Sequence, residues 1–310
     1  MTATVHVPVL LQECIEALKV RDGGRYLDCT LGGGGHSEAI LSASEGCTLV
    51  SFDRDQRAVE RAVERLAPFG ERFTAVHAPF SKVVDTEQGR FDGILADLGI
   101  SSDQLAEGRG FSFRDDGPLD MRMDESAPRT ADEVVNTYGE GQLIRVLKRG
   151  GCGSEARYVA RAILKHRPLR STADLNQLVQ GVMKGRKSGK SSNPATVVFQ
   201  AIRIEVNGEF EEIETLLDGI PQLAHPGGRV AVISFHSLED KLIASRMRDW
   251  EGRDHMPALH PGRREVVSLG RLLTRKAILP SEQECEVNSR ARSARLRIFE
   301  FSNKGSSDGE

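Results

Sequence analysis

The stretch LDCTLGGGGHSEAI, residues 27–40, carries the clearest chemical signal, because four consecutive glycines follow an apolar run. Glycines between a strand and a helix let the backbone approach a ligand closely. A loop that binds a triphosphate needs a Lys-Ser or Lys-Thr pair after its glycines, and GGGGHSEA contains none. The remaining ligands are a dinucleotide and a ligand without any phosphate.

Two aspartates near this turn bear on that choice. A dinucleotide-binding fold has the pattern GxGxxG here and an acidic residue about 20 residues later that binds the ribose. Gly32, Gly34 and Ser37 nearly fit that pattern, and Asp53 follows Gly34 by nineteen residues. Asp28, directly before the turn, argues against a pyrophosphate, since a carboxylate would repel it.

A carboxylate in that position suits the ammonium group of an amino-acid moiety. S-adenosylmethionine has this shape, with an ammonium, a sulfonium, a ribose and an adenine but no phosphate. Asp53 is then the acceptor for both ribose hydroxyls. A structural interpretation of Asp28, as a carboxylate that braces the loop or caps a helix, stays open.

The elements around these residues follow an α/β rhythm. Short apolar runs that alternate with helical patterns predict βαβ units and a parallel sheet covered on both faces. The expected strands are residues 25–30, 47–53, 72–78 and 91–99, with helices over 36–44 and 55–69 between the first three.

The pattern changes in the middle of the chain. Residues 107–203 show no convincing strand and contain short basic helices at 155–166 and 171–183, the second opened by Ser171 and Asp174 as a helix cap. Later the rhythm returns, with a helix at 207–220, a strand at 227–237, a helix at 237–250 and a closing strand at 290–302. We therefore expect one α/β domain, residues 1–106 and 204–310, interrupted by a helical insertion, residues 107–203.

Charge is unevenly distributed along the chain, although the net charge is only −3. The segment 143–190 has two acidic and twelve basic residues, which makes it +10 and leaves −13 for the rest. Such asymmetry indicates a polyanionic partner, and a solvated basic face is the alternative. The basic residues are Arg145, Lys148, Arg149, Arg157, Arg161, Lys165, Arg167, Arg170, Lys184, Arg186, Lys187 and Lys190.

Composition excludes several classes of protein. The sequence has no apolar run of the roughly 18–20 residues that cross a membrane, and its N-terminus lacks the features of a secretory signal. The five cysteines are scattered, with no Cys-x-x-Cys pair, which favours reduced thiols in the cytoplasm. No His, Cys and Asp cluster has the spacing of metal ligands, so no metal is expected.

Several longer segments together resemble one family. They include HVPVLLQECIEAL, DCTLGGGGHSEAIL, GFSFRDDGPLDMRMD, VISFHSLEDKLI and NSRARSARLRI. Over residues 6–300 the sequence is similar to the bacterial ribosomal small-subunit methyltransferase H family. The resemblance implies a Rossmann-like class I S-adenosylmethionine-dependent methyltransferase fold with an inserted helical domain. It also implies methylation of the N4 amine of a decoding-centre cytidine in 16S rRNA, within the 30S subunit, and leaves a homodimer open.

The resemblance also assigns the site residue by residue. The glycine turn would contact the cofactor S-adenosylmethionine, Asp53 would hold its ribose, and Phe80 would lie near its adenine. The full set of cofactor contacts implied in this way is Gly34, Gly35, His36, Asp53, Phe80, Asp97 and Gln104.

Methylation of a cytosine amine puts a specific demand on the site. The amine is a poor nucleophile because its lone pair is delocalised into the ring, so the enzyme must orient it and offer an acceptor for its hydrogens. Asp97, at the end of the fourth expected strand, is the candidate catalytic acceptor, and holding the amino group of the cofactor is its alternative role. Ser101 and Ser102 are weaker candidates, for which a turn or cap role is the simpler explanation.

Three further residues allow two interpretations each. Phe111 and Phe113, in a loop rich in Gly and Asp, either stack on an extruded base or close the core of the insertion. His236, at the end of an expected strand, either contacts RNA or has a structural role.

Two other functions compete with RNA methylation. One is a nicotinamide-dependent oxidoreductase, against which Asp28 and the lack of a catalytic Lys, His and Tyr set argue. The other is a non-catalytic ribosome-assembly factor on the same fold, against which Asp53, Asp97 and the complete glycine run argue.

Overall fold

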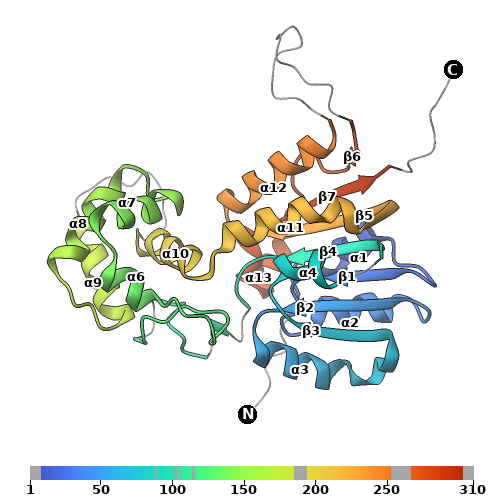
Figure 1. Cartoon of the computed structure of the whole chain (residues 1–310), viewed down its shortest axis with the longest axis horizontal. Helices are drawn as coiled ribbons and strands as arrows, with labels where there is room; N and C mark the ends of the chain where they lie inside the picture. The colour runs from blue at the N-terminus through green and yellow to red at the C-terminus, as the bar shows by residue number, and fades with distance from the viewer. Residues whose placement is uncertain are drawn as a thin grey trace, which may run out of the picture. The chain divides into compact units, whose positions relative to one another are not determined.

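A computed structural model describes residues 8–87, 89–101, 104–105, 107–113, 116–184, 194–252 and 267–302. The chain divides into two compact units, one of residues 1–99 and 212–310 and the other of residues 100–211 (Figure 1). The sequence placed these boundaries at 106/107 and 203/204. Helix α10 (Pro194–Asn207) runs through the second of those positions, so the chain leaves the helical unit later than the sequence indicated.

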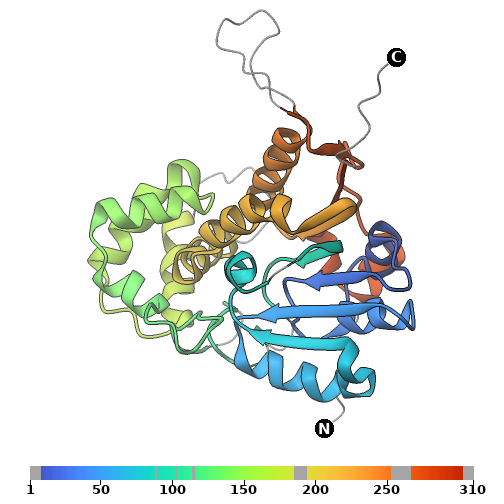
Figure 2. The same cartoon turned by 45° about the vertical axis from the view of Figure 1, so that its right-hand side comes forward.

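The first unit is built on a seven-stranded sheet of order β3-β2-β1-β4-β5-β7-β6. Strands β1 to β5 are parallel, and β7 runs antiparallel to both β5 and β6. Figure 2 shows β1, β2 and β3 side by side, all running in the same direction. The strands are β1 (Arg25–Asp28), β2 (Thr48–Asp53), β3 (Phe73–His77), β4 (Phe91–Asp97), β5 (Ala224–Ser234), β6 (Gly270–Leu272) and β7 (Arg295–Phe301). The parallel sheet predicted from the alternating pattern is thus confirmed.

Helices cover both faces of this sheet, and neighbouring residues of one strand belong to different cores. Leu27 and Ile94 pack with side chains of α11, whereas Tyr26 and Leu95 pack with side chains of α1 and α2. Burial on both faces explains why the central strands are continuous apolar runs in the sequence. The helices around the sheet are α1 (Leu11–Leu18), α2 (Gly35–Ser42), α3 (Gln56–Leu66), α4 (Val83–Thr86), α11 (Glu209–Leu223), α12 (Ser237–Trp250) and α13 (Glu282–Val287).

The second unit is helical and has one apolar core. Its described residues contain no strand, and the Ser171 side chain caps α9 by accepting a hydrogen bond from the Asp174 N–H at 3.3 Å. Its helices are α6 (Ala131–Thr137), α7 (Glu140–Arg149), α8 (Ala156–Lys165), α9 (Thr172–Met183) and α10. Helices α8 and α9 were predicted from the sequence, and the other three were not.

Short 3-10 segments complete the secondary structure, at Ala67–Arg72, Phe80–Lys82, Gly153–Glu155 and Ala291–Ser293. None of the helices in the described part of the chain is long and apolar enough to span a membrane.

Candidate active site

Three carboxylates lie at the carboxyl ends of neighbouring parallel strands. Strand β1 ends at Asp28, β2 at Asp53 and β4 at Asp97. The strand order reverses between β1 and β4, because the chain adds β2 and β3 on one side and continues with β4 on the other. Ligands of open α/β sheets bind outside the carboxyl ends of the strands at such a switch point.

The glycine turn connects β1 to α2 at this edge. Gly34 lies at the N-cap of α2 with φ 78° and donates its N–H to the Leu31 carbonyl at 2.8 Å. Gly35 has no room for a side chain, since a Cβ there would lie 2.4 Å from Pro8 Cγ. At these two glycines the turn has backbone atoms only, and it is followed by the first backbone N–H groups of α2, which have no partner within the helix.

Asp53 is held by the backbone and keeps acceptor capacity. Its Oδ2 accepts the Gly32 N–H at 2.7 Å, and its Oδ1 accepts the Asp55 N–H at 2.8 Å. A carboxylate has about four acceptor positions, so two directed hydroxyl groups can still bind. Burial raises the pKa of Asp53 to about 6, against the opposing effect of its hydrogen bonds to the N–H groups of Asp55 and Gly32.

Asp97 combines burial with an unused oxygen. Its side chain is 21% exposed, yet its Oδ1 is buried and has no hydrogen-bond partner among the described residues. Burial raises the pKa of Asp97 to about 6, with His36 lowering it and Asp28 raising it as smaller effects. A buried acceptor without a partner is costly, and it is the kind of group that a ligand satisfies.

His36 lies beside Asp97 in the first turn of α2. Its Nδ1 is 3.6 Å from Asp97 Oδ2, and its Nε2 is 3.1 Å from the Val9 carbonyl oxygen. Because a carbonyl only accepts, Nε2 carries a proton and Nδ1 faces the carboxyl group. The ring is buried and is thereby fixed between the N-terminal segment and β4.

Asp28 has its hydrogen-bond partners inside the protein. The residue is fully buried, and its two oxygens accept hydrogen bonds from the Thr30 N–H at 3.0 Å and the Ser37 hydroxyl at 2.7 Å. Ser37 in turn lies 3.0 Å from the hydroxyl of Ser51 on β2. Asp28 therefore braces the glycine turn, and its burial and hydrogen bonds favour this structural interpretation over contact with an ammonium group.

The other predicted cofactor contacts lie in different surroundings. Phe80 begins a short 3-10 segment after β3 and packs partly buried against the core on the α11 face. Gln104 belongs to the second unit, where its Oε1 accepts the Ser101 N–H at 3.0 Å and its own N–H donates to the Ser101 hydroxyl at 3.1 Å. Ser101 thus has a local turn role, and Ser102 lies outside the described residues.

The aromatic and histidine candidates have structural partners. Phe111 is buried in the core of the second unit, and Phe113 packs edge-on against Phe199 with 5.7 Å between ring centroids. His236 caps α12 by accepting the Glu239 N–H. These contacts favour the structural interpretation for all three residues.

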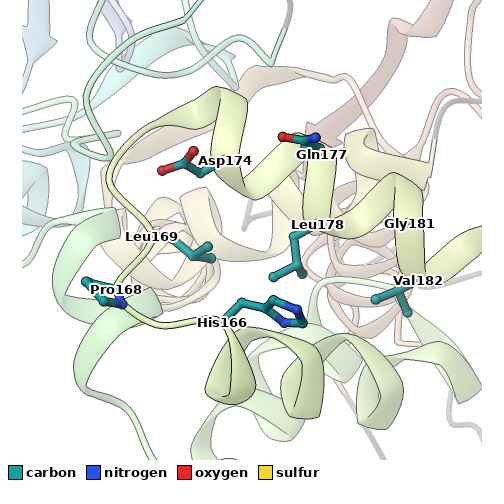
Figure 3. Close-up of a pocket in the computed structure, with 8 residues that line it drawn as sticks. All are labelled: His166, Pro168, Leu169, Asp174, Gln177, Leu178, Gly181 and Val182. Atoms are coloured by element: carbon teal, nitrogen blue, oxygen red, sulfur yellow. The ribbon is translucent and has the colours of Figure 1, made fainter.

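A separate pocket lies in the second unit, between the end of α8 and the face of α9 (Figure 3). Its volume is about 660 Å³. Leu178 points toward the ring of His166 across it, and Asp174 and Gln177 lie along α9 above. The remaining lining residues are Pro168, Leu169, Gly181 and Val182. The sequence analysis did not predict this pocket.

Three hydroxyl residues connect the strand ends without having been predicted to do so from the sequence, namely Thr30, Ser37 and Ser51. Each has a small polar side chain next to an expected strand end or turn, which was the available signal. Only their mutual contacts distinguish them from ordinary turn residues.

The donor and acceptor pattern fits a particular kind of ligand. Two carboxylates with free acceptor positions, beside a bare glycine turn, suit a ligand with positive charge and vicinal hydroxyl groups. They do not suit a pyrophosphate, since anions would face Asp53 and Asp97. S-adenosylmethionine meets this description.

Comparison with known proteins agrees with this chemistry. A sequence model of the MraW methylase family matches residues 3–302. Ribosomal RNA small subunit methyltransferase H of Cyanothece sp. is 47% identical over 297 residues, covering 95% of this chain and 94% of that protein. The protein of the same name from Carboxydothermus hydrogenoformans is 46% identical over 309 residues, covering 95% and 97%.

Among solved structures, an rRNA methylase from Streptococcus thermophilus is 10% identical, with a TM-score of 0.44 over 97% of this chain and 99% of that one. Similarity at that level does not support an inference about function. The sequence matches do, because they extend over nearly the whole chain. The chain therefore belongs to the MraW methylase family, a family of S-adenosylmethionine-dependent methyltransferases with a Rossmann-like fold.

Proposed function

We propose that this protein transfers a methyl group from S-adenosylmethionine to the N4 amine of a decoding-centre cytidine in 16S rRNA, within the 30S subunit in the cytoplasm. Membership of the family and the names of its relatives support an rRNA methyltransferase. The observation that carries the assignment of the reacting group is the buried Asp97 Oδ1, which has no partner among the described residues.

Different residues of the first unit contact different parts of the cofactor. Asp53 binds the ribose hydroxyls through its two remaining acceptor positions, and the backbone at Gly34 and Gly35 lies against the uncharged part of the ligand. Phe80 packs near the adenine, and Gln104 is the remaining cofactor contact that the family resemblance implies. When bound, S-adenosylmethionine supplies a methyl group activated by its positively charged sulfonium.

Asp97 acts on the nucleophile. Its Oδ1 accepts a hydrogen of the N4 amine and directs the nitrogen lone pair out of the ring plane. As the nitrogen forms its bond to the methyl carbon and the sulfur–methyl bond breaks, Asp97 takes the proton that the nitrogen loses. A carboxyl group with a pKa of about 6 is ionised at neutral pH and still basic enough to accept that proton.

His36 Nδ1 lies 3.6 Å from the other oxygen of the same carboxyl group, which is too far for a hydrogen bond. With Nε2 donating to the Val9 carbonyl, the ring is held in one orientation beside Asp97. The family resemblance implies that His36 contacts the cofactor.

The proposal is tested on the RNA itself. Nucleosides of 16S rRNA from cells with and without the gene are compared by mass spectrometry, and the gene is then restored as wild type, Asp97→Asn or Asp92→Asn. Asp92 is a matched control because it lies on the same strand at its opposite end and pairs with Arg21 at 2.7 Å. We expect N4-methylcytidine with wild type and Asp92→Asn and its loss with Asp97→Asn.

Unchanged N4-methylcytidine in the deletion strain would contradict the proposal and favour a non-catalytic assembly factor. Full methylation by Asp97→Asn would leave the enzyme in place but remove Asp97 from the reaction.

A further inference from the structure

The backbone of β1 changes partners at the switch point. The Cys29 N–H donates to the Leu95 carbonyl of β4 at 2.8 Å, whereas the Leu31 N–H donates to the Phe52 carbonyl of β2 at 2.8 Å. The pairing of β1 with β4 ends at Asp28 and Leu95. The last part of β4 therefore extends beyond its neighbour, and the Asp97 N–H has no β1 carbonyl opposite it.

Thr30 occupies the place of the missing carbonyl. The Asp97 N–H donates to Thr30 Oγ1 at 2.6 Å, and the Thr30 hydroxyl lies 3.4 Å from Asp28 Oδ1, to which it donates. The Thr30 N–H holds the same oxygen at 3.0 Å. One hydroxyl group thus accepts from β4 and donates to β1.

Asp28 is itself firmly anchored. Its Oδ2 accepts the Ser37 hydroxyl of α2, which lies 3.0 Å from the Ser51 hydroxyl of β2. The chain of hydrogen bonds therefore runs from the helix after the glycine turn, through Asp28 and Thr30, to the backbone of Asp97. Linked hydrogen bonds in a buried site polarise and strengthen one another.

We propose that Thr30 is a positioning residue for methyl transfer, holding the backbone of Asp97 so that Oδ1 faces the substrate. This inference rests on the proposed function. The arrangement secures the main chain of Asp97 but consumes nothing of Oδ1, which keeps its acceptor capacity. Without the hydroxyl, the last N–H of β4 would be left unpaired in a partly buried place, and the end of the strand would shift.

Two substitutions separate positioning from folding. Thr30→Val keeps the shape and removes the hydroxyl, whereas Thr30→Ser keeps the hydroxyl. Thr86→Val is the control, since the Thr86 hydroxyl donates only within its own helical segment, to the carbonyls of Lys82 and Val83. The measurements are methyl transfer to 30S subunits, S-adenosylmethionine affinity by calorimetry, melting temperature, and hydrogen exchange of the Asp97 amide in the protein alone.

For Thr30→Val we expect kcat to fall by about 10- to 100-fold, the scale for a misplaced reacting group, while cofactor affinity changes less than about threefold. Exchange of the Asp97 amide should accelerate at least about tenfold, as for loss of a protecting hydrogen bond. Thr30→Ser and Thr86→Val should resemble wild type in all four measurements. If Thr30→Val does not fold, Thr30→Ala removes the same hydroxyl without placing a methyl group against Asp28.

The proposal is overturned if Thr30→Val keeps the wild-type kcat, or if Thr30→Ser is as slow as Thr30→Val. It is also overturned if affinity, melting temperature and rate fall in parallel, because that pattern indicates a structural role alone. Failure of the proposed function looks different: Asp97→Asn would then retain the rate, while the exchange of the Asp97 amide would still report the bond to Thr30.

Discussion

Asp28, Asp53 and Asp97 each end a parallel strand, yet their surroundings give them different chemistry. Asp28 is fully buried and accepts hydrogen bonds from Thr30 and Ser37. Asp53 is half satisfied by two backbone N–H groups, and Asp97 keeps one oxygen entirely unused among the described residues. The three carboxylates therefore differ in how much acceptor capacity they keep, and the proposed roles of Asp53 and Asp97 follow that order.

Substitution of Asp53 tests its role at the ribose. Asp53→Ala should weaken S-adenosylmethionine binding by about 1.5–3 kcal/mol, the scale for hydrogen bonds to a charged group, as measured by calorimetry. Asp55→Ala is the control, because Asp55 caps α3 by accepting the Arg57 N–H and should cost stability rather than affinity. Unchanged affinity in Asp53→Ala would remove Asp53 from the ribose.

The pH dependence of cofactor binding distinguishes the roles of Asp53 and Asp97. Both have a pKa raised to about 6 by burial, and the ionised form of Asp53 is the one that accepts both hydroxyls. As pH falls below about 6, protonation of Asp53 should therefore reduce affinity toward tenfold per pH unit, while affinity levels off above pH 7.

The same titration is informative for Asp97. Below about pH 6, we expect the slope of log affinity against pH to correspond to about one proton both in the wild type and in Asp97→Asn. A wild-type slope near two that drops to one in Asp97→Asn would instead assign Asp97 to the amino group of the cofactor, because a second carboxylate would then have to ionise for binding.

At the scale of elements, the turn between β1 and α2 depends on the absence of side chains. Gly34 adopts φ 78°, which L-amino acids rarely adopt. At Gly35, Pro8 occupies the space that a side chain would need. The turn must also deliver the Gly32 N–H to Asp53 and Ser37 to Asp28. A displacement of this short segment would therefore disturb two of the three strand ends together.

Gly35→Ala should destabilise the protein by about 1–3 kcal/mol, the usual cost of overpacking, since its Cβ would lie 2.4 Å from Pro8 Cγ. We also expect weaker cofactor binding, because relief of the contact moves the turn. Gly181→Ala is the matched control: it lies within α9 with nothing within 4 Å of an added Cβ, and should stabilise the helix by up to about 1 kcal/mol. Chemical denaturation of both variants checks this pair, and a Gly35→Ala protein as stable as wild type would show that Pro8 yields freely.

At the scale of the whole molecule, the excess of positive charge lies in one segment of the second unit and not over the whole unit. Residues 100–211 hold seventeen Lys and Arg against fifteen Asp and Glu, so the excess comes from the segment 143–190. Part of that excess is already engaged, since Arg149 pairs with Glu211, Arg161 pairs with Glu140, and Arg167 donates to two backbone carbonyls. The remaining cations are those with most to gain from phosphate contacts.

Salt dependence tests whether this segment meets RNA. Neutralising Lys184, Arg186, Lys187 and Lys190 together should weaken binding to rRNA or 30S subunits and flatten its dependence on log salt. The expected change is about 0.7–0.9 slope units per phosphate contact. Lys184 is exposed at the end of α9, and the other three lie outside the described residues. Filter binding across a salt series measures the slope.

Two comparisons make that experiment decisive. S-adenosylmethionine affinity should stay at the wild-type value, because the glycine turn, Asp53 and Asp97 belong to the other unit. Arg149→Gln with Arg161→Gln, which removes two cations already paired with glutamates, should change the slope less. An unchanged slope in the four-residue variant would mean that these charges meet no phosphate.

The parallel sheet and the glycine turn could be predicted from the amino-acid sequence alone. Strands β1, β2 and β4 are read correctly because burial on both faces requires continuous apolar runs, and α12 because its apolar positions repeat at helical spacing. Helices α6, α7 and α10 were missed, since in a small helical unit packing rather than local pattern selects which short segments fold.

Only the tertiary structure shows which acceptor positions each aspartate keeps. In the sequence, Asp28 and Asp97 are each a carboxylate at the end of an apolar strand. Asp28 is buried and accepts hydrogen bonds from Ser37 and Thr30, whereas Asp97 meets Thr30 through its backbone and keeps Oδ1 without a partner among the described residues. These contacts join residues up to 67 positions apart, and no local pattern specifies the partners that a carboxylate will meet at that separation.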